Sequence, residues 1–194
     1  FDHIGEGAYE ETEMKIQELL SEIGKDTSGT ALSATPDLTP ELQRRTPELY
    51  AGHNFALPRG QNIGNREGIK PGELVTYEKP EKTTKDVIYL EGLWISNPDN
   101  LQSQGQSSIL LDFTASSANI VASSQQNDIE MEVLINNEYI TKEQAGEDIR
   151  FKGNKSVIEI KEPRLYNIVN GNYGDYKLTL KINSKEFSFN AFTF

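Results

Sequence analysis

The sequence predicts a mainly β protein, an antiparallel jelly-roll β-sandwich preceded by an N-terminal α-helix. Three observations support this prediction. Apolar residues recur at helical spacing near the start of the chain, and they alternate with polar residues in short segments after residue 72. Turns rich in Gly, Asn and Ser separate those segments, with no helical pattern between them. The 194 residues suffice for one sizeable domain with an extension.

The predicted helix runs from Ala8 to Ile23. Its apolar residues fall mostly on one stripe, and three glutamates lie in its first turn, where the helix dipole favours negative charge. Gly24 is expected to cap the C-terminal end. A single amphipathic helix of this length is marginal in water. We therefore expect the Tyr9–Ile23 helix to dock on the rest of the chain, to pair with a second copy as a homo-oligomer, or to be partly disordered.

The chain divides into three predicted parts. Residues 1–24 contain the helix and the short segment before it. Residues 25–71 are rich in Ser, Thr, Gly, Pro and Asn without periodicity, so we expect a linker followed by a loop-rich segment. Residues 72–194 form the predicted β-sandwich.

About nine short strands are expected in the sandwich because apolar and polar residues alternate in nine segments. Asn136 and Asn137 tolerate positive φ and favour a hairpin turn after the fifth strand. The last strand ends on apolar residues, so it is expected to lie inside a sheet. The nine segments are 73–77, 87–96, 108–114, 118–122, 129–135, 156–160, 165–169, 176–182 and 186–194.

Composition limits the classes of partner. The net charge is −11, and residues 1–50 hold eleven acids against four bases. The chain has no basic stripe with interleaved aromatics, which argues against nucleic acid. No apolar run is long enough for a membrane helix. The absence of Cys rules out disulfides, thiol catalysis and Cys-ligated metals within these residues.

Catalysis has little support in the sequence. His3 and His53 are not at metal-ligand spacing from other ligands, and no nucleophile elbow or phosphate loop is present. Glu130 and Glu132 share one strand face, which leaves a carboxylate-based glycoside hydrolase as an alternative. Alternating acids on the solvated face of a strand explain the pair more simply. We expect no enzyme activity and no cofactor.

A Ca²⁺ site is a second alternative, and a turn accounts for the same residues more simply. Asn97, Asp99 and Asn100 offer oxygen ligands between two strands, but the same residues favour a turn by local hydrogen bonding. We expect the turn and no bound metal.

The aromatic residues suggest a ligand. Sugar rings stack on amphipathic aromatic side chains, and most strand aromatics are nevertheless core residues. Trp94 and Tyr166 lie on predicted strands, and Tyr173 lies in an Asn- and Gly-rich loop. Arg164 precedes Tyr166 and could form a salt bridge or a polar wall of a cleft. These four residues are the predicted ligand-binding candidates.

Five stretches occur together in a characteristic order. They are His3–Glu13 continuing into Ile16–Leu20, then Thr46–Gly52, Leu90-x-Gly92-x-Trp94, Arg164–Val169 and Ala191–Phe194. Together they resemble the C-terminal region of DipZ-type, thioredoxin-like (TlpA-like) thiol–disulfide proteins. The resemblance spans nearly the whole chain.

The resemblance implies a periplasmic or otherwise extracytoplasmic redox protein. In that family a thioredoxin-like domain with a CxxC site is followed by a β-sandwich similar to carbohydrate-binding modules. This chain has no CxxC, so redox activity does not transfer to its residues. The resemblance also implies that the N-terminal helix is the last helix of a thioredoxin-like domain that is otherwise absent.

Two functions follow as expectations. The first is a non-catalytic accessory domain that binds carbohydrate. The second is a structural domain that packs on the thioredoxin-like domain and shapes substrate access to it. A fold shared with sugar-binding modules does not by itself establish sugar binding.

Overall fold

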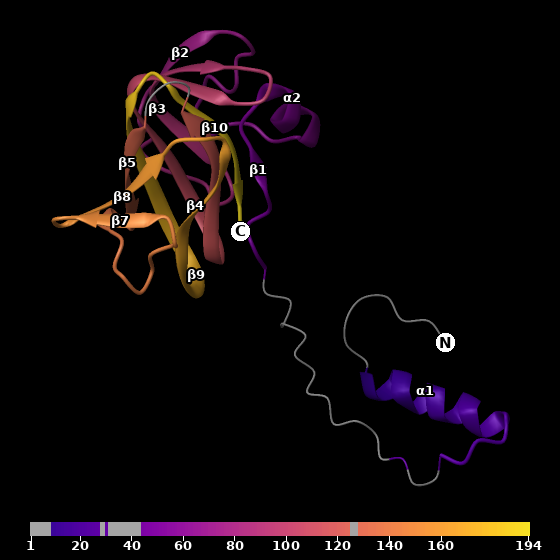
Figure 1. Cartoon of the computed structure of the whole chain (residues 1–194). Coiled ribbons are helices and arrows are strands. Elements are labelled where there is room, and N and C mark those ends of the chain that lie inside the picture. The colour runs from indigo at the N-terminus through magenta and orange to yellow at the C-terminus, as the bar shows by residue number, and fades with distance from the viewer. Residues whose placement is uncertain (1–8, 28–29, 31–43, 125–127) are drawn as a thin grey trace. The chain divides into compact units, whose positions relative to one another are not determined.

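The computed structural model describes residues 9–27, 30, 44–124 and 128–194. They belong to two units, one ending at Gln43 and the other formed by Arg44–Phe194. Figure 1 shows a helix in the first unit and a β-rich second unit. Each unit is described by itself.

The described part of the first unit contains helix α1 (Tyr9–Glu22), so the predicted N-terminal helix is confirmed. Gly24 adopts φ 77° and ends the helix as predicted. The N–H of Gly24 donates to Ser21 O and that of Lys25 to Leu20 O, which satisfies two carbonyls of the last turn. Five apolar side chains of this segment are exposed, namely Met14, Ile16, Leu19, Leu20 and Ile23. No helix among the described residues is long and apolar enough to cross a membrane.

The second unit is an antiparallel β-sandwich, which confirms the predicted fold class. Its described residues form one ten-stranded sheet together with the short helices α2 (His53–Ala56) and η1 (Leu57–Arg59). The strands are β1 (Leu49–Tyr50), β2 (Leu74–Tyr77), β3 (Ile88–Ser96), β4 (Leu101–Ser124), β5 (Ile129–Ile135), β6 (Glu138–Tyr139), β7 (Ile149–Lys152), β8 (Lys155–Ile160), β9 (Arg164–Ser184) and β10 (Phe187–Thr193).

Two long strands organise the sheet. β4 and β9 pair from Gly105↔Ser184 to Ala122↔Arg164. The segments 108–114 and 118–122, predicted as separate strands, are one strand in the structure, as are 165–169 and 176–182. Between Ala115↔Gly174 and Ser117↔Asn170 the ladder skips Ser116 and residues 171–173, so a bulge accommodates the extra residues and the pairing resumes on either side.

The last strand closes the sheet around the core. Ser188 pairs with Ser123 near the end of β4 and with Gln102 near its beginning, and Phe189 does the same with Ala122 and Leu101. β10 therefore has β4 on both edges, which agrees with the expectation that the final strand lies inside a sheet.

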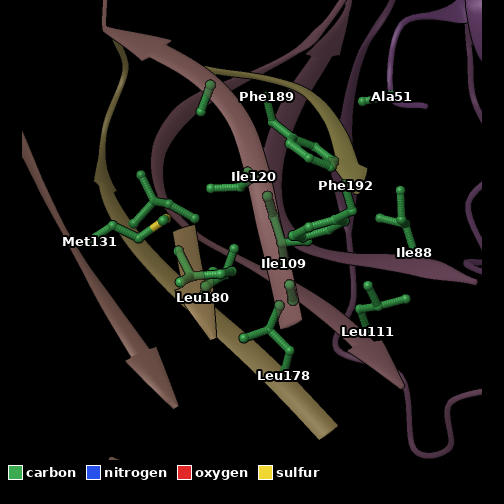
Figure 2. Close-up of a cluster of buried hydrophobic side chains, with 14 of the residues drawn as sticks. Ala51, Ile88, Ile109, Leu111, Ile120, Met131, Leu178, Leu180, Phe189 and Phe192 are labelled. Carbon is green, nitrogen blue, oxygen red and sulfur yellow. The ribbon is translucent and has the colours of Figure 1, made fainter. Parts of the chain in front are cut away.

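The core is built from alternating side chains that point inward from these strands. Figure 2 shows part of the cluster, with Ile109 and Leu111 of β4 near residues of β9 and β10. The rings of Phe189 and Phe192 lie 4.7 Å apart between centroids, and neither ring is exposed. Burying such a side chain contributes about 1.5–3 kcal/mol.

The compact unit begins earlier than the sequence predicts. The predicted sandwich starts at residue 72, whereas the structure includes the chain from Arg44 onward. Leu49 and Tyr50 pair with β10, and residues between β1 and β2 enter the core, namely Ala51, Ala56, Ile63 and Ile69. Within the predicted linker, residues 28–29 and 31–43 lie outside the described residues.

Candidate functional site

Trp94 is a core residue and offers no ring face to a ligand. Its side chain is 1% exposed, and its indole N–H donates to Glu91 O at 3.0 Å. The ring meets Phe187 edge to face. Trp94 lies on the same face of β3 as the buried Ile88 and Leu90, so alternation turns it inward. Gly92 has φ 93°, and the register against β4 shifts beside it. The Leu90-x-Gly92-x-Trp94 stretch therefore supplies two core side chains, and Gly92 faces a bulge of β4.

Tyr166 is also buried. Its hydroxyl donates to Glu162 O and accepts the N–H of Lys161, both at 2.8 Å. The guanidinium of Arg164 covers the ring 3.7 Å from its centroid. The structure thus brings Arg164 and Tyr166 together, but neither face of the phenol ring is open for stacking.

Arg164 forms the ion pair that was one of its two predicted roles. Its two terminal nitrogens donate to Asp148 at 2.7 and 3.1 Å, a two-point contact between a planar cation and a carboxylate. Burial disfavours the charged carboxylate, but hydrogen bonds from Arg164 and the Asn167 N–H outweigh burial and lower the pKa of Asp148. Arg164 and Tyr166 also line a depression of about 170 Å³.

The same strand fastens a neighbouring loop. Asn167 accepts the N–H of Glu147 at 2.9 Å and donates to the side chain of Asn119 at 2.8 Å. A Cβ at Gly146 would lie 2.3 Å from Asn167 O, so only glycine fits there. Asp148 and Asn167 were not among the predicted candidates. The Arg164–Val169 stretch therefore holds residues 146–148 against β9.

Tyr173 is the exposed member of the predicted set. Its side chain is 41% exposed, and its hydroxyl donates to Arg44 O at 2.6 Å. Trp94 contacts Phe187, and Tyr173 contacts Arg44, whereas Arg164 and Tyr166 contact residues within 148–162. The four candidates therefore do not form one site. Tyr173 instead holds the first residue of the compact unit.

The chain that begins the unit is fixed along its length, and we name residues 44–52 the N-terminal strap. Thr46 is buried, its N–H donates to Thr114 O at 2.9 Å, and its hydroxyl accepts the Thr114 N–H at 2.8 Å. The same hydroxyl donates to the carboxylate of Asp86. One threonine thus ties the strap to β4 and to the turn before β3.

The far end of the strap is fastened as firmly. Leu49 and Tyr50 add β1 to the edge of β10. The Gln61 side chain accepts the Tyr50 N–H at 2.8 Å and donates to Glu48 O at 2.7 Å, so it caps the outer edge of β1. A Cβ at Gly52 would lie 2.2 Å from the backbone of Asp99. The strap therefore ends in a close backbone contact.

Beside the strap lies a surface that we name the aromatic patch, formed by Tyr50, Phe55, Leu57 and Arg59. The rings of Tyr50 and Phe55 stack with 6.3 Å between centroids, and the Arg59 guanidinium lies 4.5 Å from the Tyr50 centroid. Phe55 is 45% and Leu57 39% exposed. Among the described residues no carboxylate lies within ion-pair distance of Arg59, which donates to Phe55 O instead.

A polar trough of about 420 Å³ lies along β4 and β9. Asp112 accepts the Thr83 hydroxyl at 2.9 Å and the Lys177 ammonium at 3.0 Å. Of the described residues that line the trough, none is aromatic. They are Pro80, Glu81, Lys82, Thr83, Leu110, Asp112, Asn137, Lys177, Leu178 and Thr179.

The two residue sets considered for catalysis or Ca²⁺ have structural partners. Glu132 of β5 pairs with Lys155 of the neighbouring β8, and Glu130 of β5 pairs with Lys152 of β7, one strand further along the sheet. The N–H of Asn97 donates to Asn100 O at 2.9 Å, as in the expected turn. Within the part of the chain that the structure describes, no three His, Cys, Asp or Glu residues are grouped so as to hold a metal ion.

Comparison with known proteins supports a thioredoxin-like C-terminal domain. A family model described as "Thioredoxin like C-terminal domain" matches residues 46–194. The match begins within the N-terminal strap and covers the rest of the second unit. No curated protein matches the chain.

Proposed function

The chain belongs to the thioredoxin-like C-terminal domain family, and we propose that residues 44–194 are a non-catalytic accessory domain that packs on a thioredoxin-like domain and shapes substrate access to it. The thiol chemistry belongs to that domain, because this chain contains no Cys. The setting that suits such a pair is extracytoplasmic, as the resemblance to DipZ-type proteins implies.

The N-terminal strap is the observation that supports this proposal. It is tied by Tyr173 at Arg44, by Thr114 and Asp86 at Thr46, and by β10 at Leu49–Tyr50. A flexible tether would need none of these contacts. A strap held at both ends fixes the point at which the preceding chain leaves the unit, and so limits how far a preceding domain can lie from it. An accessory domain that shapes access needs such restraint.

The experiment compares two forms of a protein that carries a thioredoxin-like domain ahead of residue 1, one with and one without residues 44–194. Reduction of a small disulfide is expected to proceed at the same rate in both forms, because a small molecule reaches the thiols in either case. Reduction of folded protein disulfides is expected to change several-fold. Equal rates toward protein disulfides would contradict the proposal.

Carbohydrate binding is the second candidate, and the polar trough is the observation that favours it. Asp112, Lys177 and Asn137 offer charged and amide groups that suit hydroxyl-rich ligands. The aromatic platform expected for sugar stacking is not supplied by Trp94 or Tyr166, which are buried. Glycan-array binding that is lost in Asp112→Ala would support this function, and no binding to any glycan would contradict it.

Self-association through α1 is an alternative for the first unit. Its exposed apolar stripe favours a partner surface, whereas the excess of glutamates in α1 opposes close pairing of two copies. Sedimentation over a hundredfold concentration range distinguishes a monomer from a homo-oligomer. Loss of any dimer in Leu19→Ser would assign the contact to this stripe.

A further inference from the structure

The aromatic patch has the composition of a protein-binding surface. Tyr, Phe and Arg are common among residues that dominate binding energy at interfaces. Here one residue of each type is stacked in a fixed order, with Arg59 over Tyr50 and Tyr50 against Phe55. Leu57 extends the apolar area beside them.

The patch is preorganised for contact. The Tyr50 backbone is held by β10 on one side and by Gln61 on the other, and its hydroxyl donates to Glu48 at 2.6 Å. The Arg59 guanidinium is held by Phe55 O at 3.0 Å and by stacking. Side chains already fixed in place lose little rotamer entropy when a partner binds. Such a surface therefore binds at lower cost than a set of mobile side chains.

The charge and the position of the patch indicate its partner. Arg59 has a hydrogen bond and stacking contacts but no carboxylate partner among the described residues, so a partner that supplies a carboxylate gains a charge-assisted hydrogen bond. The patch lies within fifteen residues of the start of the compact unit, beside the strap that leads to it. A domain that precedes the strap in the chain is tethered next to the patch, so we take it as the partner.

We propose that the aromatic patch is the face that contacts the preceding thioredoxin-like domain, with Phe55 and Leu57 packing on an apolar area and Arg59 pairing with a carboxylate. This inference rests on the proposed function. Beyond the proposed function, it names the residues of this domain that make the contact and the apolar and acidic groups expected on the thioredoxin-like domain.

The test measures hydrogen exchange at the amides of residues 53–61. In the 194-residue chain these amides lie in and directly after two single-turn helices, and elements this short are expected to open locally. In the longer protein with a thioredoxin-like domain ahead of residue 1, their exchange is expected to slow by about tenfold or more, because contact blocks local opening. The variants Phe55→Ser and Arg59→Glu are expected to abolish this protection in the longer protein.

Matched controls are present on the same domain. Phe151 on β7 is 44% exposed, nearly the same exposed fraction as that of Phe55. Arg66 is an exposed arginine outside the patch. Phe151→Ser and Arg66→Glu are expected to leave the protection at residues 53–61 intact. Circular dichroism of each variant of the 194-residue chain shows whether it still folds.

The outcomes separate the two proposals. Protection that appears on another face of residues 44–194, and not at 53–61, overturns the patch and leaves the proposed function standing. Protection at 53–61 that survives Phe55→Ser and Arg59→Glu also overturns the patch. Absence of protection anywhere on residues 44–194 overturns both.

Discussion

Asp148 connects two segments that are far apart in sequence. It accepts both terminal nitrogens of Arg164 and the backbone N–H of Asn167, and Arg164 in turn covers Tyr166. We expect Asp148→Asn to lower the free energy of unfolding by about 1–3 kcal/mol at neutral pH, because the charged acceptor of these bonds is lost. Urea denaturation measures the change. Asp128→Asn, which removes one exposed ion pair with Lys161, is the control and is expected to cost far less.

The pH dependence of this contact has a definite sign. The pKa of Asp148 is lowered in the folded state, so its contribution is fully present above the unfolded pKa of about 3.9. It is lost as the pH falls through the folded pKa. The stability difference between the wild type and Asp148→Asn should therefore be constant above about pH 5 and shrink below about pH 4. A difference that grows on acidification would contradict this role.

For single residues, the sequence predicts contacts between neighbours on one strand better than contacts between distant segments. Arg164 and Tyr166 are two positions apart on one strand, so their proximity could be predicted. Asp148 lies 16 residues away in a loop without periodicity, and no local pattern predicts that contact. Trp94 lies four residues after the buried Leu90 on β3, so alternation alone places it on the inner face and its burial could be predicted.

Among the elements, strands with clear alternation could be predicted, and very short ones could not. β2, β3, β5, β8 and β10 lie close to their predicted ranges, and Asn136 and Asn137 adopt the positive φ expected of the hairpin turn. β1, β6 and β7 have two to four residues, too few for alternation to be recognised. Residues 44–71 have the local composition of a loop. β1 forms there because it pairs with β10, which is distant in sequence, and no local pattern reveals that pairing.

Gly92 tests the close approach of β3 to the bulged part of β4. Its φ of 93° is unfavourable for other residues, and a Cβ would lie 2.5 Å from Gln106 O. Gly92→Ala is expected to lower the free energy of unfolding by roughly 2–4 kcal/mol. Gly153→Ala, with φ 59° and no atom near the added Cβ, isolates the backbone cost and should lose about 1 kcal/mol. Equal losses in thermal or urea denaturation would show that the close approach to β4 is unimportant.

For the whole molecule, the described core lies within the second unit, between Leu49 and Phe192. We therefore expect residues 44–194 to fold without residues 1–43, with a Tm within about 2 °C of that of the 194-residue chain. Differential scanning calorimetry measures both forms. A Tm several degrees lower after the deletion would mean that the preceding residues contribute to the stability of this unit, as docking of the α1 stripe would require.

The rotational diffusion of the longer protein tests most directly whether this domain is held rigidly on a thioredoxin-like domain. A strap fixed at Arg44, Thr46 and Tyr50, together with packing of the two domains on each other, is expected to make both tumble as one body. ¹⁵N relaxation would then give one rotational correlation time for residues 44–194 and for the thioredoxin-like domain. Two separate correlation times, each matching an isolated domain, would contradict the proposed function.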